Sequence, residues 1–171
     1  MVNVRHMARQ RALQLLYALE FADPEDEDFT LVERRFLNLS PSHRRGWGPF
    51  ARELTRAANE QRHELDEAIE PMLRGWRLDR LPPVELICLR LALCELRRFP
   101  DIPLRVTINE YIELTRQFSG EEATQYVNAV LDRLAAQFPH KDFKTGPGGP
   151  TTAEPSQPDE APPDERPDKP D

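Results

Sequence analysis

The chain has 171 residues, a length that suits one domain or two closely packed halves. Its formal net charge is −7, but the seven acidic and two basic residues between Thr145 and Asp171 contribute −5, which leaves −2 for residues 1–144. No apolar stretch approaches the roughly 18 residues needed to cross a bilayer, so we expect no membrane-spanning segment.

Helical periodicity begins near the start of the chain. Apolar residues from Ala8 to Leu19 recur at helical spacing and predict an amphipathic helix over residues 4–21. Arginine and glutamine residues interrupt its apolar stripe and no small-residue cleavage site follows, so we expect no signal peptide and a cytoplasmic protein. The pattern predicts a shorter helix over residues 29–39, ended by Pro41.

The middle of the chain predicts a long helix followed by a central one. Pro49 stands where prolines start helices, and near-heptad apolar spacing continues to about residue 72, with a kink or break expected near Pro71. Prolines 82 and 83 open the next helix. Residues 84–96 are so apolar that we expect this helix to lie at the centre of the fold.

Two further apolar stripes indicate helices over residues 106–118 and 121–134, separated by Ser119-Gly120. No alternating apolar run is bounded by hairpin turns, so we expect no sheet. The predicted fold class is therefore all-α, with about six to seven helices. Trp47 and Trp76, both beside glycines, are expected to cover the core at helix ends.

The composition changes at about residue 142. Residues 143–171 are rich in proline and acidic residues, and eight of the 17 prolines of the chain fall after Lys144. Such a segment buries too little apolar surface to offset its ordering entropy, so we expect a disordered acidic tail. Its acids could compete with an anionic ligand for the arginines near the N-terminus (Arg5, Arg9 and Arg11), or they could serve only solubility.

The cysteines and histidines argue against a disulfide or a metal site. Cys88 and Cys94 are six residues apart in one helical pattern, roughly 9 Å along the axis, which is too far for a disulfide. They are typical of small buried residues in a reducing compartment. The four histidines show no zinc-ligand spacing, so no metal or other cofactor is expected.

The N-terminal helix carries a local basic cluster. Arg5 and Arg9 are one turn apart on a face opposite much of the leucine stripe, with His6 beside them, and this arrangement could present guanidinium groups to phosphates. A solvated helix face is the competing interpretation. Tyr17 and Tyr126 could stack on nucleobases, although such aromatic residues more often line the edge of a core.

No sequence pattern supports an enzyme. The chain has no phosphate-binding glycine loop, no dinucleotide motif and no nucleophile elbow. The best acid–base candidates are Glu110, Glu113, Glu121 and Glu122, and the first two share a helical face. Solvated carboxylates and helix-start acids explain this group more simply, so we expect a non-catalytic protein.

Three segments together resemble the bacterial transcription antitermination factor family NusB (N-utilization substance B). They are ARQRALQLLY at 8–17, GWRLDRLPPVELICLRLALCEL at 75–96, and DIPLRVTINEYIELTRQFSGEEATQYVNAVLDRL at 101–134. The third looks like the family signature Ile-Asn-Glu-x-x-Glu-Leu followed by Val-Asn-x-Val-Leu-Asp. The resemblance spans residues 4 to about 138.

The resemblance implies an all-α domain over residues 1–142, with halves of about 1–75 and 76–142, that binds RNA without catalysis. Its expected ligand is a boxA-like single-stranded RNA of nascent ribosomal transcripts. It is expected to bind this RNA together with a small-subunit ribosomal protein (the tenth in the usual naming), other Nus factors and RNA polymerase. The residues that match RNA-facing positions are Arg5, His6, Arg9, Tyr17, Glu122, Gln125 and Tyr126, and Glu85 matches a position facing the ribosomal protein.

Two other functions remain open at this point. The chain could be a helical protein-binding or dimerising scaffold whose basic end is incidental. It could also be a non-catalytic partner related to the N-terminal domains of ribosomal RNA methyltransferases, since no unit for holding a nucleotide cofactor follows the helices.

Overall fold

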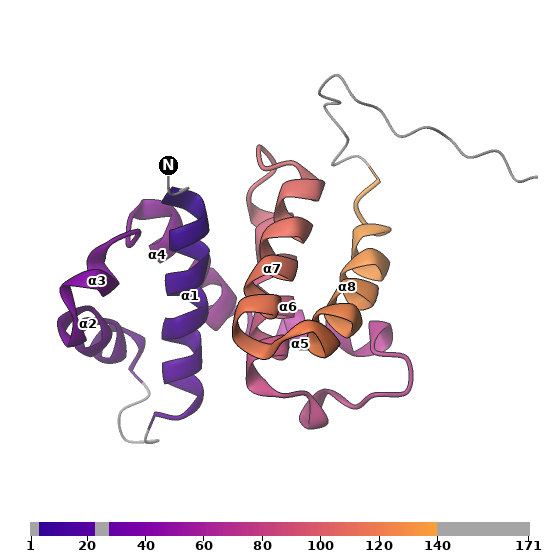
Figure 1. The fold of residues 1–171 in the computed structure, drawn as a ribbon, viewed down its shortest axis with the longest axis horizontal. Helices are drawn as coiled ribbons and strands as arrows, with labels where there is room; N and C mark the ends of the chain where they lie inside the picture. The colour runs from indigo at the N-terminus through magenta and orange to yellow at the C-terminus, as the bar shows by residue number, and fades with distance from the viewer. Residues whose placement is uncertain (1–3, 23–27, 140–171) are drawn as a thin grey trace, which may run out of the picture.

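The computed structural model describes residues 4–22 and 28–139, and every regular element among them is a helix (Figure 1). The all-α fold class is confirmed. The helices are α1 (Val4–Glu20), α2 (Phe29–Leu39), α3 (Pro41–Arg44), α4 (Pro49–Glu60), α5 (Arg62–Ile69), α6 (Pro83–Arg98), α7 (Leu104–Ser119) and α8 (Glu121–Ala135). Two short 3₁₀ helices, Glu70–Met72 and Leu78–Arg80, join α5 to α6.

Local chemistry explains where several helices begin. The carboxylate of Asp28 accepts a hydrogen bond from the backbone N–H of Leu31 and so caps α2. The hydroxyl of Ser40 does the same for α3, which has a proline in its first turn. Pro49 and Pro83 start α4 and α6 in the same way, because a missing N–H costs nothing at a first helical position.

The long helix expected from residue 50 ends near Pro71 as predicted, but it is also interrupted ten residues earlier. Gln61 separates α4 from α5, with backbone angles of φ −95° and ψ 16°. Near Pro71 the α-helix ends at Ile69, and Pro71 lies in the first turn of the 3₁₀ helix that follows. The break at Gln61 is additional to this one. The break lets Leu65 and Ile69 of α5 turn into the main core, where both are fully buried.

Helix α6 lies at the centre of the molecule, as its apolar sequence predicted. Every residue from Glu85 to Leu96 is buried, and α1, α4, α5, α7 and α8 all pack against it. A smaller cluster of Leu15, Val32 and Phe36 holds α2 against the outer face of α1. Helix α1 therefore has buried contacts on two sides, towards α2 and towards α6.

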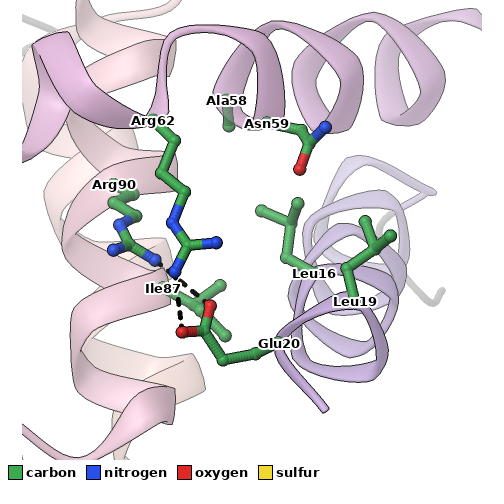
Figure 2. A pocket seen from close by; sticks show the side chains of 8 residues that line it. All are labelled: Leu16, Leu19, Glu20, Ala58, Asn59, Arg62, Ile87 and Arg90. Carbon is green, nitrogen blue, oxygen red and sulfur yellow. Dashed lines mark hydrogen bonds and ion pairs between the residues drawn. The ribbon is translucent and has the colours of Figure 1, made fainter. Parts of the chain in front are cut away.

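Polar contacts fasten the C-terminal end of α1 to α5 and α6 (Figure 2). The carboxylate of Glu20, on α1, forms ion pairs with Arg62 at 2.8 Å and with Arg90 at 3.5 Å. Arg90 also donates two hydrogen bonds to the carboxylate of Asp66 on α5, at 2.7 and 2.8 Å. Paired bonds from one guanidinium fix direction as well as distance, so these groups set how the three helices meet.

Two expectations fall outside this description. The predicted disordered tail, residues 143–171, lies outside the described residues, and the division into halves of about 1–75 and 76–142 stays a prediction. None of the described helices is long and apolar enough to span a membrane.

Candidate nucleic-acid interface

The first turn of α1 presents two of the predicted RNA-facing residues to solvent. The side chain of Arg5 is 53% exposed, lies over the ring of Phe50 and approaches Asp101 at 3.7 Å. His6 is partly buried, and its Nδ1 lies 2.8 Å from a carboxylate oxygen of Glu110 on α7. More than half of the Arg5 side chain is exposed, so its guanidinium is accessible from solvent.

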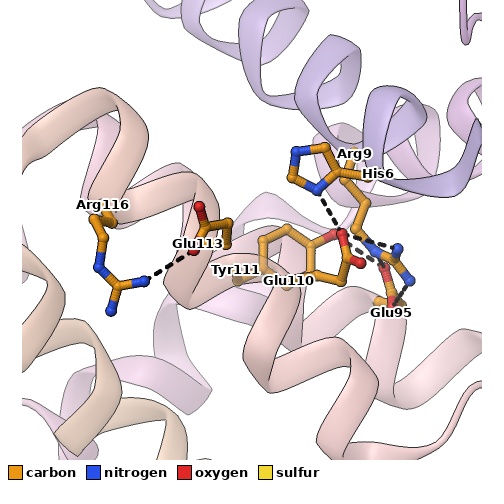
Figure 3. A network of polar contacts seen from close by, with 7 residues as sticks. All are labelled: His6, Arg9, Glu95, Glu110, Tyr111, Glu113 and Arg116. Carbon is orange, nitrogen blue, oxygen red and sulfur yellow. Dashed lines mark hydrogen bonds and ion pairs between the residues drawn. The ribbon is translucent and has the colours of Figure 1, made fainter. Parts of the chain in front are cut away.

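Arg9 is not on a solvated face, contrary to the expectation from its spacing. Its side chain is completely buried between α1, α6 and α7 (Figure 3). It donates two hydrogen bonds to Glu95, at 2.7 and 2.8 Å, and its Nη1 lies 3.4 Å from Glu110. Neighbouring helices cover this face of α1 at Arg9 but not at Arg5. Arg9 therefore has no access to a phosphate in this structure.

Glu95 is the centre of this buried network. Besides Arg9, it accepts hydrogen bonds from the hydroxyls of Thr107 at 2.8 Å and Tyr111 at 3.1 Å, and all four residues are inaccessible to solvent. Burial disfavours the charged form of Arg9, but the hydrogen bonds and charge of Glu95 outweigh it and raise the pKa of Arg9. Burial, with the nearby charge of Glu95, also raises the pKa of Tyr111 well above its ordinary value.

The network also positions His6. Glu110 stands between the two basic residues, and Figure 3 shows His6 and Arg9 both pointing to its carboxylate. The buried Arg9 thus holds Glu110, and Glu110 in turn holds the His6 ring near the surface. Arg9 is a positioning residue for this end of α1.

The four carboxylates considered for acid–base chemistry do not form one site. Glu110 belongs to the network around Arg9, whereas Glu113 and Glu121 pair with Arg116 at 2.9 and 3.0 Å on the surface. No group of three or more metal-binding side chains occurs among residues 4–22 and 28–139.

A groove between the start of α6 and the start of α8 brings together three other predicted residues: Glu85, Glu122 and Tyr126. Its volume is about 320 Å³. It is lined by Trp76, Leu81, Pro82, Glu85, Ser119, Glu122, Ala123 and Tyr126. Gln125, also predicted to face RNA, is exposed on the same helix.

Two oxygen atoms beside the groove lack partners. Glu85 is only 6% exposed and its Oε2 has no hydrogen bond among the described residues; the same holds for the buried hydroxyl oxygen of Tyr126. A buried polar atom without a partner costs roughly 1–3 kcal/mol, so a ligand that supplied a donor would be stabilised here. The ring of Trp76 lies 5.3 Å from that of Tyr126 and is 55% exposed, so the expectation that Trp76 covers the core is wrong.

Tyr17 lies at the opposite end of α1 from Arg5, roughly 18 Å away along the helix axis. Its ring is 42% exposed and packs at 4.8 Å against Phe21, which is 63% exposed. Phe21 lines a neighbouring hollow that shares Leu81 with the groove. The structure therefore separates the predicted residues into a basic end and an aromatic, acidic end.

Comparison with known proteins identifies the family. The sequence model of the NusB family matches residues 6–136, most of the chain. The chain belongs to the NusB family. The transcription antitermination protein NusB of Myxococcus xanthus is 39% identical over 136 residues, which cover 78% of this chain and 96% of that protein.

Solved NusB structures share the fold. A crystal form of Thermotoga maritima NusB superposes with a TM-score of 0.66 at 32% identity, covering 80% of this chain and 94% of that one. A chain in the crystal structure of the antitermination factors NusB and NusE in complex with double-stranded RNA superposes with a TM-score of 0.61 at 25% identity, with coverage of 80% and 99%.

Sequence reasoning missed the residues that organise this NusB-family site. Glu95 gave one available signal, because it is an acid inside an almost wholly apolar helix, where an unpaired charge would be costly. Trp76 was noticed but assigned to the core. The contact of Phe50 with Arg5 had no sequence signal, since these residues are brought together only by the packing of α4 against α1.

Proposed function

We propose that this chain is a transcription antitermination factor that binds boxA-like single-stranded RNA of nascent ribosomal transcripts. It does so together with the small-subunit ribosomal protein, the tenth in the usual naming, in a cytoplasmic complex with other Nus factors on RNA polymerase. It acts by binding and not by catalysis. Family membership supports this, as does the similarity to a NusB that was crystallised with NusE and RNA.

The observation that carries the site assignment is the groove with two unpartnered acceptors beside an exposed tryptophan. Stacking of a nucleobase on the aromatic pair Trp76–Tyr126 would use their exposed faces, and such stacking contributes roughly 1–3 kcal/mol per base. Gln125 and Glu122 stand at the same helix end to contact base edges. Glu85 lines the α6 side of the same groove, where the ribosomal protein would approach the bound RNA.

The basic end of α1 supplies phosphate contacts. Arg5 contacts the backbone directly, and His6, held by Glu110, adds a second donor. Arg9 contributes by holding Glu110 and not by touching RNA. Tyr17, with Phe21, offers an exposed aromatic surface at the far end of α1.

A binding site with so few cations predicts weak RNA binding by the protein alone. Affinity for nucleic acid scales with the number of phosphates that are neutralised, and residues 1–144 carry a net charge of −2. A protein partner that also contacts the RNA raises the effective concentration of each contact. We therefore expect the ribosomal protein to strengthen RNA binding.

Fluorescence anisotropy of a labelled boxA-like RNA, with and without the ribosomal protein and across a salt series, tests the proposal. We expect weak, steeply salt-dependent binding alone and tighter binding with the partner. The variant Trp76→Ala should weaken the binding of boxA-like RNA about 5- to 150-fold if a base stacks on the Trp76 ring. Arg80→Gln, an exposed arginine outside the groove and the basic end, is the control.

A scaffold function predicts a different result. If the protein only dimerises or binds proteins, RNA has no effect on anisotropy even with the ribosomal protein present, and light scattering shows a constant mass with and without RNA. That result would exclude the RNA-binding function.

A further inference from the structure

A second group of arginines lies beside α1 and is not part of the site described above. Arg44 ends α3, and Arg45 follows in the loop to α4. His43 anchors this loop, because its ring stacks on Phe36 at 4.3 Å and its Nδ1 lies 2.8 Å from the carbonyl oxygen of Phe36. The two arginines are therefore held by a fixed turn.

Gly46 allows this loop to pack closely against α1. Its φ is +87°, and a Cβ built there would lie 2.8 Å from the Cβ of Met7. A side chain at this position would be strained and would collide with the helix. The loop consequently approaches α1 closely enough for the Nε of Arg11 to donate to the carbonyl oxygen of Arg45, at 3.3 Å.

The charges of Arg11, Arg44 and Arg45 are not neutralised by any described residue. Within the part of the chain that the structure describes, no carboxylate lies within ion-pair distance of any of them. Desolvation and the neighbouring charge of Arg45 lower the pKa of Arg11, which is the effect of positive charges gathered without an acid. Arg52 and Arg62, in contrast, each have a carboxylate partner.

A hollow connects this group to Arg5. Its volume is about 290 Å³, and it is lined by Arg5 of α1 and Arg44 of α3. Ala8, Trp47 and Phe50 form apolar walls between them. The surface therefore has a basic rim over apolar and aromatic walls, which suits a nucleotide, with its phosphate on the rim and its base against the wall.

We propose that the RNA backbone continues from Arg5 across this hollow to Arg44, Arg45 and Arg11, whose guanidinium groups bind its phosphates. The inference rests on the proposed function and extends its RNA path beyond the start of α1. Because contacts to phosphates position a nucleic acid without reading its bases, this extension binds RNA of any sequence.

The double variant Arg11→Gln/Arg45→Gln tests the extension in the full chain. The side chain of Arg45 makes no hydrogen bond or ion pair with the described residues, so its loss leaves the fold intact; Arg45→Gln alone serves if the double variant melts earlier. Arg80→Gln is the control, and it is charge-matched to the single variant Arg45→Gln. Each protein is titrated into a boxA-like RNA and into a scrambled RNA of equal length and composition, across a salt series.

We expect the salt dependence of log K to become shallower by about 1.4, since each single-strand phosphate contact contributes about 0.7. That change corresponds to about 25-fold weaker binding at 0.1 M salt, relative to a 1 M reference, and it should be the same for both RNAs. Arg80→Gln should leave the slope unchanged.

An unchanged slope in the double variant, or an equal loss in Arg80→Gln, would overturn the extension. Lost binding of the ribosomal protein with unchanged RNA affinity would also overturn it and would assign the patch to a protein surface. Failure of the proposed function has a different signature: the unaltered protein then binds boxA-like and scrambled RNA equally, with or without the ribosomal protein.

Discussion

The buried pair Arg9–Glu95 gives the sharpest test of how the structure is held together. Replacing Glu95 with Gln removes the charge that compensates Arg9, leaving only Glu110 at 3.4 Å. Removal of one partner from a buried ion pair costs about 3–5 kcal/mol, because the other charge stays desolvated. Arg9→Met should cost a similar amount, since the buried carboxylate of Glu95 then loses the guanidinium that compensates its charge.

The double variant Arg9→Met/Glu95→Gln should be more stable than either single variant. It contains neither charge of the Arg9–Glu95 pair, and the carbonyl oxygen of the Gln side chain can still accept a hydrogen bond from one of the two hydroxyls. We expect a coupling free energy of at least about 2 kcal/mol in the double-mutant cycle. Urea unfolding followed by circular dichroism measures each free energy of unfolding, with the slope m checked for constancy.

Additive effects, within about 0.5 kcal/mol, would refute this account of the pair.

The double variant also separates structure from binding at Arg9. Because Arg9 is buried and acts on RNA only through Glu110 and His6, the folded double variant should weaken RNA binding at low salt less than Arg5→Gln does. A double variant that folds but loses more RNA affinity than Arg5→Gln would contradict a purely positioning role for Arg9.

Three further measurements follow from the described geometry. Gly46→Ala should lower the free energy of unfolding by about 2–4 kcal/mol through backbone strain and collision with α1. Gly75→Ala, which has a similar φ of +85° but open space around the Cβ, should lower it by only about 1–2 kcal/mol. Equal losses in thermal or urea unfolding would contradict this. Burial raises the pKa of Cys88 and of Cys94 to about 12, so both thiols are protonated in the folded state. The free energy of unfolding should therefore fall as pH rises from about 9 to 12, by up to about 2.7 kcal/mol per pH unit. A free energy from urea unfolding that stayed constant over that range would be inconsistent with buried thiols. Tyr126→Phe removes a buried hydroxyl without a partner and should leave stability unchanged or slightly raised, so a loss above about 1 kcal/mol in urea unfolding would reveal a partner for it.

The sequence predicted the elements well where chain-local chemistry decides them. The apolar run of α6 predicted its central place, and the prolines at 49 and 83 predicted two helix starts. The break at Gln61 was not predictable in this way, because neither proline nor glycine marks it. Tertiary packing of α5 onto α6 imposes it.

The site was predictable only in part, for a related reason. Helical spacing identifies the apolar face of α1, which packs against α2, α4 and α6, but Arg9 lies outside that stripe and is covered by a second contact, with polar residues of α6 and α7. A single-helix pattern contains no information about that second contact. The resemblance placed Glu85, Glu122 and Tyr126 near ligands, yet only the fold shows that they share one groove.

The buried network around Glu95 also has a consequence for synthesis of the chain. Arg9 and His6 find their carboxylate partners 86 and 104 residues later in the sequence. At a translation rate of roughly 5–20 residues per second, the first helix would emerge from the ribosome several seconds before α6 and α7 exist to receive it. Until then its arginine has no buried carboxylate to meet, so the native position of α1 is among the last features that a nascent chain can complete.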